Sequence, residues 1–445
     1  MTFEVINEIP VVPGAAVHVY QHGWQTWSPT GCFSIDSAPP RPDRAWQQIM
    51  RFRPETPAPD GVFQGEGLLI VLPGDGSALV HFAPAPQVEV ASIRATVVAG
   101  RIVVSADGAV DVRTEHADSD DNALAAALEA VGDGLGAASD ARVAAAPTVW
   151  CSWYQYFLEV AEADILENLR AIDALELPVD VVQIDDGWEA GIGDWLDLSS
   201  RFSSTRALAD QIRAAGHRPG LWLAPFIVGA ESETARAHPE WLVGDAGWNW
   251  DQRLHGLDLT HPGARDYLRR VFTGLREQGF DYVKLDFLYG GAIPGPRHDD
   301  CSPVQAYRSG LALVRQALGD DAFVVACGAP VLPSVGLVDA MRVSADTYNP
   351  EDLDNGQDVL RGRAALEARA WQQGRLWIND PDCVVARPRF AQRAEWADLA
   401  QRWGGLRSFS DRIADLDDWG VRRVRTLLQS GGTADPFETL PGLLP

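Results

Sequence analysis

The sequence predicts a β-rich N-terminal domain followed by an α/β domain with the (β/α)8, or TIM, barrel fold. Residues 1–145 contain short apolar runs separated by Gly, Pro and Asp, a pattern typical of strands joined by turns. Residues 146–430 alternate continuous apolar runs with amphipathic stretches, which is typical of a parallel sheet covered by helices. A doubly wound open sheet is the competing fold, but no Gly-x-Gly-x-x-Gly follows the first strand of this second domain.

Three apolar runs of the N-terminal domain are predicted to be strands. They are residues 67–73 (GLLIVLP), 77–84 (SALVHFAP) and 100–107 (GRIVVSAD). Residues 118–146 are rich in Ala with interspersed Gly and Asp, so we expect a helical linker there, and Pro147 closes it.

The second domain is predicted to hold eight strands and seven clear helices. The strands are 148–154, 179–185, 218–226, 281–287, 322–328, 341–346, 375–380 and 405–410. The helices are 162–175, 205–215, 264–278, 304–318, 355–371, 391–402 and 417–429. The connection after the fifth strand is the weakest candidate for a helix, because residues 328–336 contain two prolines. Residues 431–445 are too few to form a further domain, and we expect a C-terminal tail.

The composition excludes several classes of protein. With 445 residues, 46% hydrophobic and 22% charged, the chain is of ordinary globular composition and is neither disordered nor fibrous as a whole. It carries 37 Lys and Arg against 62 Asp and Glu, a net charge of −25. Such a chain repels phosphates and anionic lipids, so we expect no nucleic acid and no membrane as partner. We expect a neutral or cationic substrate instead.

The cysteines and the N-terminal residues indicate a reducing compartment. The five cysteines are scattered singly, so neither a disulfide framework nor a Cys-x-x-Cys metal site fits them. The opening residues MTFEVINEIP lack the basic and apolar regions of a secretory signal, and no run of 18 apolar residues could span a membrane. We therefore expect a cytoplasmic protein.

Carboxylates gather where the predicted barrel strands end. Those strand ends carry Asp185, Asp186, Asp286, Asp346, Asp380 and Asp382. A single Asp at a strand end is often a helix cap, but the C-terminal ends of barrel strands form one mouth, where chemistry takes place. A Mg²⁺ site is one explanation for such a cluster. Carbohydrate recognition is the other, because aromatic side chains that could stack on a sugar ring lie near the same ends. These aromatic residues are Trp153, Tyr154, Tyr156, Trp188, Trp195, Trp222 and Phe226.

Seven motifs carry a family resemblance. They are HGWQTWSPTG (22–31), CSWYQYF (151–157), VVQIDDGWEAGIGDW (181–195), RPGLWLAPF (218–226), YVKLDF (282–287), RVSAD (342–346) and NDPD (379–382). In this order they resemble the α-galactosidases of glycoside hydrolase family 36, the melibiases. The resemblance implies a β-sandwich followed by a (β/α)8 barrel, which agrees with the fold predicted from periodicity. Members of that family commonly have a C-terminal β-domain, so this chain resembles a compact form without it.

The resemblance implies a retaining exo-α-galactosidase that forms a covalent galactosyl-enzyme. Asp286 would be the nucleophile, and Asp346 would be the acid/base that first protonates the leaving oxygen and then activates water. Such a mechanism requires two carboxyl groups about 5–5.5 Å apart with different protonation states. Without the resemblance, a cap or an ion pair is as good an explanation for Asp286, and a turn for Asp346.

The remaining sugar-binding residues also follow from the resemblance. Asp185 and Asp186 would hold the 4- and 6-hydroxyls of galactose, Trp222 would contact the ring, and Arg342 would lie near O2 and the nucleophile. Cys327 and Gly328 would line the sugar, with Tyr156 and Trp27 as further pocket residues, although Trp24 competes with Trp27 for that role.

Lys284, the single lysine of the chain, stands two residues before Asp286, so the two side chains share a face of the strand. An ammonium there would favour an ionised nucleophile and could donate a hydrogen bond to a sugar hydroxyl. Arg fills every other Lys or Arg position, which suggests that a compact charge is required here.

Other activities remain open from the sequence. An α-N-acetylgalactosaminidase or a transglycosidase of the raffinose-synthase type would share the same machinery. A non-catalytic sugar-binding protein is disfavoured because both Asp286 and Asp346 are present. We expect no metal and no organic cofactor, and a galactoside or oligosaccharide as substrate. The sequence leaves the oligomeric state open, with a homo-oligomer as one alternative. Asp194, Asp380 and Asp382 are expected to support the residues that contact the sugar.

Overall fold

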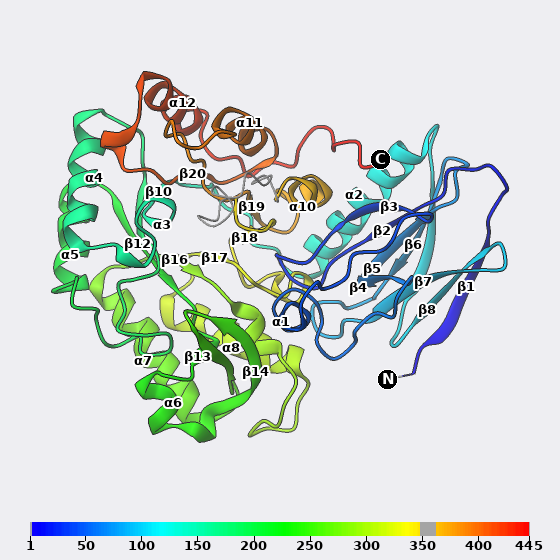
Figure 1. Ribbon diagram of the computed structural model, residues 1–445, viewed down its shortest axis with the longest axis horizontal. Coiled ribbons are helices and arrows are strands. Elements are labelled where there is room, and N and C mark those ends of the chain that lie inside the picture. The colour runs from blue at the N-terminus through cyan, green and yellow to red at the C-terminus, as the bar shows by residue number, and fades with distance from the viewer. Residues whose placement is uncertain (1, 348–361, 445) are drawn as a thin grey trace.

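The computed structural model describes residues 2–347 and 362–444, which form a barrel lobe and a β-sheet lobe side by side (Figure 1). The β-sheet lobe contains two antiparallel sheets. The four-stranded sheet has the order β1 (Glu4–Pro10), β8 (Arg101–Ala106), β7 (Ser92–Val98) and β4 (Phe63–Glu66). The five-stranded sheet has the order β3 (Gly31–Ser34), β2 (His18–Gln21), β5 (Leu68–Leu72), β6 (Ser77–Phe82) and β9 (Asp111–His116). The two sheets are consistent with the predicted β-sandwich.

The apolar run at the centre of this lobe is buried on both faces. In β5, Leu69 and Val71 pack with residues of the four-stranded sheet, whereas Leu68, Ile70 and Leu72 belong to the cluster that includes helix α2 (Asp120–Ala138). Successive side chains of a strand point to opposite faces, so a strand that is covered on both sides must be apolar throughout. Helix α2 lies within the predicted linker and packs against β6 and β9.

The barrel lobe contains the eight parallel strands that the sequence predicts. They are β10 (Thr148–Cys151), β11 (Val181–Ile184), β12 (Arg218–Leu223), β16 (Tyr282–Leu285), β17 (Phe323–Ala326), β18 (Ala340–Arg342), β19 (Ile378–Asp380) and β20 (Arg407–Phe409). Neighbouring strands pair in parallel from β19 round to β20. The carbonyl of Asn379 accepts hydrogen bonds from the N–H groups of Gly405 (2.8 Å) and Leu406 (3.0 Å), which brings the two ends of the sheet together. The predicted (β/α)8 barrel is therefore confirmed.

Helices cover the outside of the barrel close to their predicted positions. They are α4 (Glu162–Ala174), α5 (Thr205–Ala214), α7 (Pro262–Gln278), α8 (Pro303–Leu318), α10 (Arg363–Ala368), α11 (Arg393–Trp403) and α12 (Asp418–Gln429). Residues 355–361 of the predicted helix 355–371 lie outside the described residues. The connection after β17, predicted to be a weak helix, contains only the 3₁₀ turn Leu332–Ser334, in agreement with its prolines.

An insertion after β12 was not predicted. It contains β13 (Ile227–Gly229), α6 (Glu233–Ala237), β14 (Leu242–Asn249) and β15 (Gln252–Leu257), and the three strands form an antiparallel sheet. The turn of the β14–β15 hairpin consists of Trp250 and Asp251, which have φ angles of +49° and +55°. Both angles are left-handed, as in a type I′ turn, although neither residue is the usual Gly or Asn. This hairpin places Trp250 at the barrel mouth.

The C-terminal residues and a buried arginine at the lobe junction make contacts between the two lobes. Residues 431–444 run back from α12 toward α2, where the backbone N–H groups of Leu443 and Leu444 each lie 3.3 Å from Asp121 Oδ1 (Figure 1). At the junction, Arg369 is fully buried and donates to backbone carbonyls of both lobes. Within the described ranges, none of the helices has the length and apolar character needed to cross a bilayer.

Candidate active site

The candidate site occupies the carboxyl ends of the barrel strands, where the structure places the predicted carboxylates. Asp185 and Asp186 directly follow β11, and Asp286 directly follows β16. Asp380 ends β19, and Asp382 comes two residues later. These five residues are buried, whereas the side chain of Asp346, four residues beyond β18, is 51% exposed. The parallel barrel therefore brings all six residues to one mouth.

Asp185 is the ion-pair partner of the single lysine. Lys284 Nζ donates to Asp185 Oδ2 at 3.1 Å, and Gln183 Nε2 donates to the same oxygen at 2.6 Å. Burial lowers the pKa of Lys284, but the Asp185 carboxylate, with a smaller contribution from Asp286, outweighs burial and raises that pKa well above its usual value. Lys284 thus stays charged and acts on Asp286 at longer range, while its direct contact is with Asp185.

Asp186 lies between an indole and a second carboxyl group. Trp250 Nε1 donates to Asp186 Oδ2 at 2.8 Å, whereas Asp186 Oδ1 is buried without a donor among the described residues. Burial raises the pKa of Asp186 well above its usual value, and the nearby Glu189 carboxyl, within hydrogen-bonding reach, raises it further. Burial also raises the pKa of Glu189. Two buried carboxyl groups this close disfavour each other's ionisation.

Asp286 is held rigidly in the position predicted for the nucleophile. Trp222 Nε1 donates to Asp286 Oδ2 at 3.1 Å, and the N–H of Phe287 donates to Oδ1 at 2.8 Å. The N–H of Asp286 itself donates to the carbonyl of Leu223 at 2.7 Å, which anchors it to the neighbouring strand β12. The two hydrogen bonds fix the orientation of the carboxyl oxygens, which a nucleophile requires.

Asp346 and Asp382 are linked by one guanidinium group. Arg342 Nη2 lies 2.8 Å from Asp346 Oδ1 and 2.8 Å from Asp382 Oδ2. Asp382 Oδ2 also accepts hydrogen bonds from the Tyr154 hydroxyl and from both the N–H and the hydroxyl of Thr347, each of the latter two at 2.8 Å. Asp382, expected only to support the site, is thus the centre of the network that positions Asp346.

The surroundings of Asp346 favour its protonated form. Burial of the mouth raises the pKa of Asp346, and the Arg342 guanidinium opposes this. The carboxylates of Asp382 and Asp286 raise the pKa further, and Lys284 lowers it slightly. The net effect is a raised pKa, although half of the side chain is open to solvent at the mouth.

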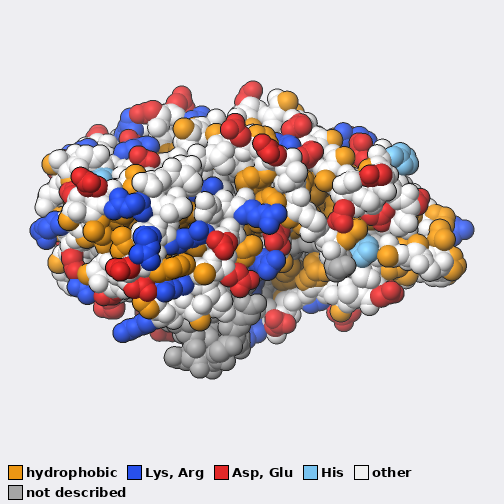
Figure 2. Space-filling model, turned by 90° about the horizontal axis from the view of Figure 1, so that it is seen from above, with side chains coloured by type: hydrophobic (Ala, Val, Ile, Leu, Met, Phe, Trp, Pro, Cys, Tyr) orange, Lys and Arg blue, Asp and Glu red, His pale blue; other side chains and the backbone are white. Residues whose placement is uncertain are grey.

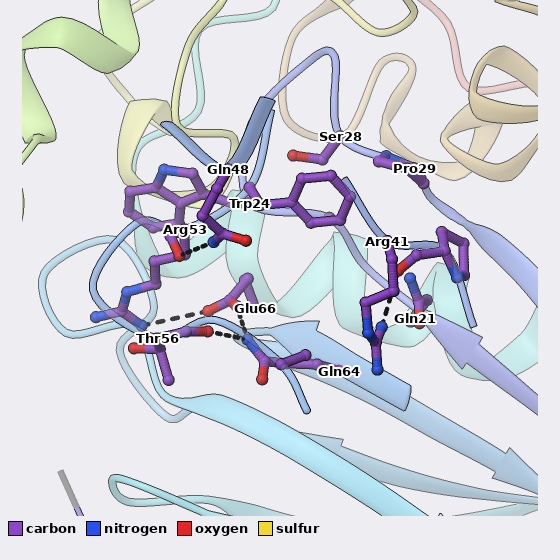
Figure 3. Close-up of a pocket in the computed structure, with 14 residues that line it drawn as sticks. Gln21, Trp24, Ser28, Pro29, Arg41, Gln48, Arg53, Thr56, Gln64 and Glu66 are labelled. Atoms are coloured by element: carbon purple, nitrogen blue, oxygen red, sulfur yellow. Dashed lines mark hydrogen bonds and ion pairs between the residues drawn. The ribbon is translucent and has the colours of Figure 1, made fainter. Parts of the chain in front are cut away.

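Trp27, rather than Trp24, reaches the barrel. The ring of Trp27 meets Phe287 edge-on with centroids 5.0 Å apart, and its Nε1 is buried without an acceptor among the described residues. Gly328 allows this approach, because a Cβ there would lie 2.9 Å from both the Trp27 ring and the Phe287 nitrogen. Trp24 lies inside the β-sheet lobe with the Arg53 guanidinium 5.3 Å from its ring (Figure 3).

Two other predicted pocket residues have different surroundings. Cys327 is fully buried at the end of β17, and its Sγ lies 4.0 Å from Arg342 Nη1, beside the ion-pair network. Tyr156 is turned toward helix α4, where Asn168 Nδ2 donates to its hydroxyl at 2.6 Å. No described contact joins Tyr156 to the carboxylates of the mouth. Asp194 is likewise remote from them, because it accepts from the backbone of Glu233 and Thr234 at the start of α6.

A cleft opens at the mouth on the side of β10, β19 and β20. Its volume is about 500 Å³, and it is lined by the loops that follow these three strands. Tyr154, whose hydroxyl bonds to Asp382, forms part of its wall. A second pocket, in the β-sheet lobe around Trp24, Arg53 and Glu66, has a volume of only about 30 Å³, enough for one or two waters (Figure 3).

Sequence reasoning missed Trp250 and Glu189 as site residues. Trp250 is distant in sequence from every predicted motif, and its ring centroid lies 6.3 Å from that of Trp222 and 4.9 Å from that of Phe287. Glu189 lies within the quoted motif 181–195, three residues after Asp186, so its spacing could have marked it.

In the part of the chain that the structure describes, no group of three or more His, Cys, Asp and Glu is placed to share a metal ion.

A (β/α)8 barrel whose mouth combines buried carboxylates with indole rings has the side chains that a sugar-binding site requires. Comparison with known proteins shows which family the chain is similar to. Residues 137–306 match the melibiase family model, which confirms the resemblance seen in the sequence. An α-galactosidase of Escherichia coli is 29% identical over 157 residues, 32% of this chain and 22% of that protein. The α-galactosidase AgaA of Geobacillus stearothermophilus is 30% identical over 186 residues, 38% of this chain and 25% of that protein.

Solved structures extend the similarity beyond these partial matches. The matched stretch spans only about a quarter or less of the two curated relatives. The α-galactosidase TtGalA of Thermus thermophilus, in complex with p-nitrophenyl α-D-galactopyranoside, is 27% identical. Its alignment covers 96% of this chain and 89% of that chain, with a TM-score of 0.78. A second TtGalA structure contains stachyose. The AgaA structure, 15% identical with a TM-score of 0.62, shares the fold.

Proposed function

We propose that the chain is a retaining exo-α-galactosidase that removes terminal α-D-galactosyl residues. The observation that carries this proposal is the pair Asp286 and Asp346 at one mouth. Asp286 is buried and is held by two hydrogen bonds to its carboxyl oxygens, whereas Asp346 has a raised pKa and is half open to solvent. Two carboxyl groups with such different surroundings are what a double-displacement glycosidase requires. The α-galactosidases with which the chain shares its fold support the substrate.

The proposed reaction proceeds in two displacements. An Asp286 oxygen attacks the anomeric carbon while Asp346 donates its proton to the leaving oxygen, so the glycosidic bond breaks and a galactosyl ester forms. Asp346, now a carboxylate, takes a proton from water, and that water attacks the anomeric carbon and releases Asp286. Positive charge that develops on the sugar ring is stabilised by the acidic mouth. No metal or organic cofactor takes part in this scheme.

The galactose ring is proposed to lie between the carboxylates and the indoles. Asp185, paired with Lys284, and Asp186 would bind hydroxyl groups at the end of the ring remote from the anomeric carbon. Trp222 and Trp27 would border its faces, and the unpartnered Nε1 of Trp27 would donate to a hydroxyl group. Arg342 holds Asp346 and would contact the 2-hydroxyl. Cys327 and Gly328 would line the sugar on the side of β17.

The test is a panel of aryl α-glycosides of galactose, N-acetylgalactosamine, glucose and xylose. We expect release of the aryl group from the galactoside between pH 4 and 8, with the other sugars slower by at least about tenfold. Preferential cleavage of the N-acetylgalactosaminide would transfer the proposal to that sugar. Absence of release from every glycoside would refute it, and unchanged rates with a chelator are expected throughout.

A further inference from the structure

A buried amide lies inside the barrel, between the apolar interior and the carboxylates of the mouth. Val181, Gln183 and Asp185 share one face of β11 and its C-terminal extension, because successive side chains of a strand alternate between two faces. Val181 packs in the apolar cluster of the barrel interior. Branched apolar side chains usually fill the layers of such a barrel, so Gln183, which is only 3% exposed, is an exception.

Side chains from two other strands meet Gln183 at a single oxygen atom. Cys151 is the parallel partner of Gln183 on β10, and Lys284 stands on β16. Asp185 Oδ2 lies 2.6 Å from Gln183 Nε2, 3.1 Å from Lys284 Nζ and 3.3 Å from Cys151 Sγ. Gln183 Nε2 also lies 3.4 Å from Cys151 Sγ, so the amide and the thiol hold each other in place. All four side chains are buried.

The thiol and the amide both act as donors toward Asp185. Burial, contact with Cys383 and the negative charge of Asp185 raise the pKa of the Cys151 thiol well above its usual value, so the sulfur keeps its hydrogen. The amide nitrogen of Gln183 can only donate. Hydrogen bonds are directional, so donors from three strands fix the rotation of the Asp185 carboxyl group.

Asp185 Oδ1 is consequently the oxygen that remains for a ligand. Among the described residues, its only donor is the N–H of Asp186, at 3.1 Å, which leaves it able to accept a further hydrogen bond. The N–H of Asp185 donates to Ser152 Oγ at 2.9 Å, so the backbone is also tied to the loop after β10. A carboxyl group fixed through one oxygen presents the other at one defined position, as the recognition of a single hydroxyl group requires.

We propose that Gln183 and Cys151 are positioning residues that orient Asp185 toward one hydroxyl group of galactose, at the end of the ring remote from the anomeric carbon. The proposal rests on the function proposed above and assigns part of the sugar selectivity to side chains that do not touch the sugar. Lys284 supplies the charge that faces Asp185, whereas the amide and the thiol supply the direction. Without them the carboxyl group rotates about its bond, and binding weakens only for sugars that carry the recognised hydroxyl group.

The test compares three 2,4-dinitrophenyl glycosides: the α-D-galactoside and its 4-deoxy and 6-deoxy analogues. For Gln183→Leu, we expect kcat/KM for the galactoside to fall about tenfold to a hundredfold. On the analogue that lacks the hydroxyl group bound by Asp185, the loss should be at most about twofold, because the lost orientation no longer matters. Equal losses on all three sugars, or no loss on any, would overturn the proposal.

Rescue of the thiol provides a second measurement, which decides the question if Gln183→Leu does not fold. Cys151→Ala should lower kcat/KM for the galactoside about fivefold, whereas Cys151→Ser, whose hydroxyl group still donates, should stay within about twofold of the unaltered enzyme. Cys32→Ala, which removes a free thiol of β3 in the other lobe, is the matched control and should change no rate. Equal rates for Cys151→Ala and Cys151→Ser would contradict the role of the thiol as a donor. Failure of the unaltered protein to cleave the galactoside would instead refute the galactosidase function itself.

Discussion

Arg342 is the side chain that links Asp346, the proposed acid/base, to Asp382. It reaches Asp346 and Asp382 with the same nitrogen, and both contacts are 2.8 Å. Because Asp382 Oδ2 already accepts three other hydrogen bonds, it cannot readily move, and Arg342 is fixed in turn. The position and the protonation of Asp346 are therefore set by residues from three segments of the barrel mouth.

Replacement of Asp346 by Ala should alter the pH dependence of catalysis. A general acid must be protonated, so the activity of the unaltered enzyme falls as pH rises through the raised pKa of Asp346. In the variant, we expect kcat on a disaccharide to drop by about 10²–10⁴ and the alkaline limb of its pH profile to disappear. The rate with galactosyl fluoride, whose leaving group needs no proton, should fall far less. An unchanged alkaline limb would assign the acid role to another residue.

Replacement of Lys284 by Arg should impair the enzyme although the charge is conserved. The ammonium is almost fully buried and lies 3.1 Å from Asp185, which leaves little space for a planar guanidinium. We expect kcat/KM for an aryl galactoside to fall by about a hundredfold, with the folded state verified by circular dichroism. Full activity in this variant would contradict the role given to the lone lysine.

The positions of the strand-end carboxylates and of Lys284 at the mouth could be predicted, because each position depends only on the strand to which the residue belongs. A residue directly after a barrel strand must lie at the mouth, whichever side chains surround it. Trp250 and the exact partner of Lys284 could not be predicted in this way. Both depend on contacts between segments 64 and 99 residues apart. Asp382 was underrated for the same reason, because its donors come from three different elements.

Strained backbone is concentrated in the segments that form the mouth. Three aromatic residues have left-handed φ angles, and all three border it: Phe157 at +47°, Trp250 at +49° and Phe287 at +51°. Such angles are costly for bulky side chains and persist only where the surroundings impose them. The β14–β15 hairpin is the clearest case, because its turn residues combine this strain with the hydrogen bond from Trp250 to Asp186.

Relief of strain in this hairpin should stabilise the protein. Asp251, at the second turn position with φ +55°, has no described contact with the carboxylates of the mouth, and Gly is the preferred residue there. We expect Asp251→Gly to raise the free energy of unfolding by about 0.5–1 kcal/mol in urea titrations. Asp60→Gly is the control, since Asp60 is exposed without a positive φ and the change should destabilise slightly. If Asp251→Gly destabilised the protein as much as the control does, the claim that the backbone is strained at Asp251 would be contradicted.

The regular elements of the barrel were predicted well, and the insertion after β12 was not. Apolar strands and amphipathic helices have periodicities that follow from burial on two faces or on one. Strand β13 has only three residues, all buried, whereas β14 mixes buried and exposed positions and has register shifts on both sides of Asp245. A pattern of that kind has no clear period, so only the folded chain shows that these residues form a sheet.

The two lobes are joined by a buried cation that has no carboxylate partner among the described residues. Arg369 donates to the carbonyls of Gln25, Thr26 and Ser28, to the hydroxyl of Thr30 and to the carbonyl of Val343. Burial lowers its pKa to about 10, so it remains charged at neutral pH. These bonds fix the loop that carries Trp27 against the barrel, close to the end of β18. The β-sheet lobe thereby contributes to the site.

Removal of this cation should destabilise the whole molecule. Arg369→Ala would leave several buried carbonyls unpaired and a cavity at the lobe junction, so we expect a loss of about 3 kcal/mol or more in the free energy of unfolding. Arg101→Ala breaks an exposed ion pair with Glu8 and should change stability by less than about 0.5 kcal/mol. Equal, small effects in the two variants, measured by urea unfolding, would show that the junction does not depend on Arg369.

The architecture of each lobe was predictable because its strands and helices follow simple rules of burial. The residues that join the two lobes were not predictable. The motif at 22–31 indicated that an N-terminal tryptophan reaches the barrel, and the resemblance left two candidates. Trp27 and Trp24 are distinguished only by the packing of Gly328 and by the Arg53 contact of Trp24. Arg369, the residue that holds the loop in place, stands more than 300 residues away in sequence.

The role of Asp286 is tested most directly by Asp286→Gly in the presence of azide. The variant should lose turnover of an aryl α-galactoside by at least about 10³-fold, because no covalent intermediate can form. Azide, occupying the vacated space, should restore release of the aryl group and yield β-galactosyl azide, which proton NMR identifies by its anomeric coupling. Formation of α-galactosyl azide, or turnover by the variant close to that of the unaltered enzyme, would contradict a retaining mechanism through Asp286.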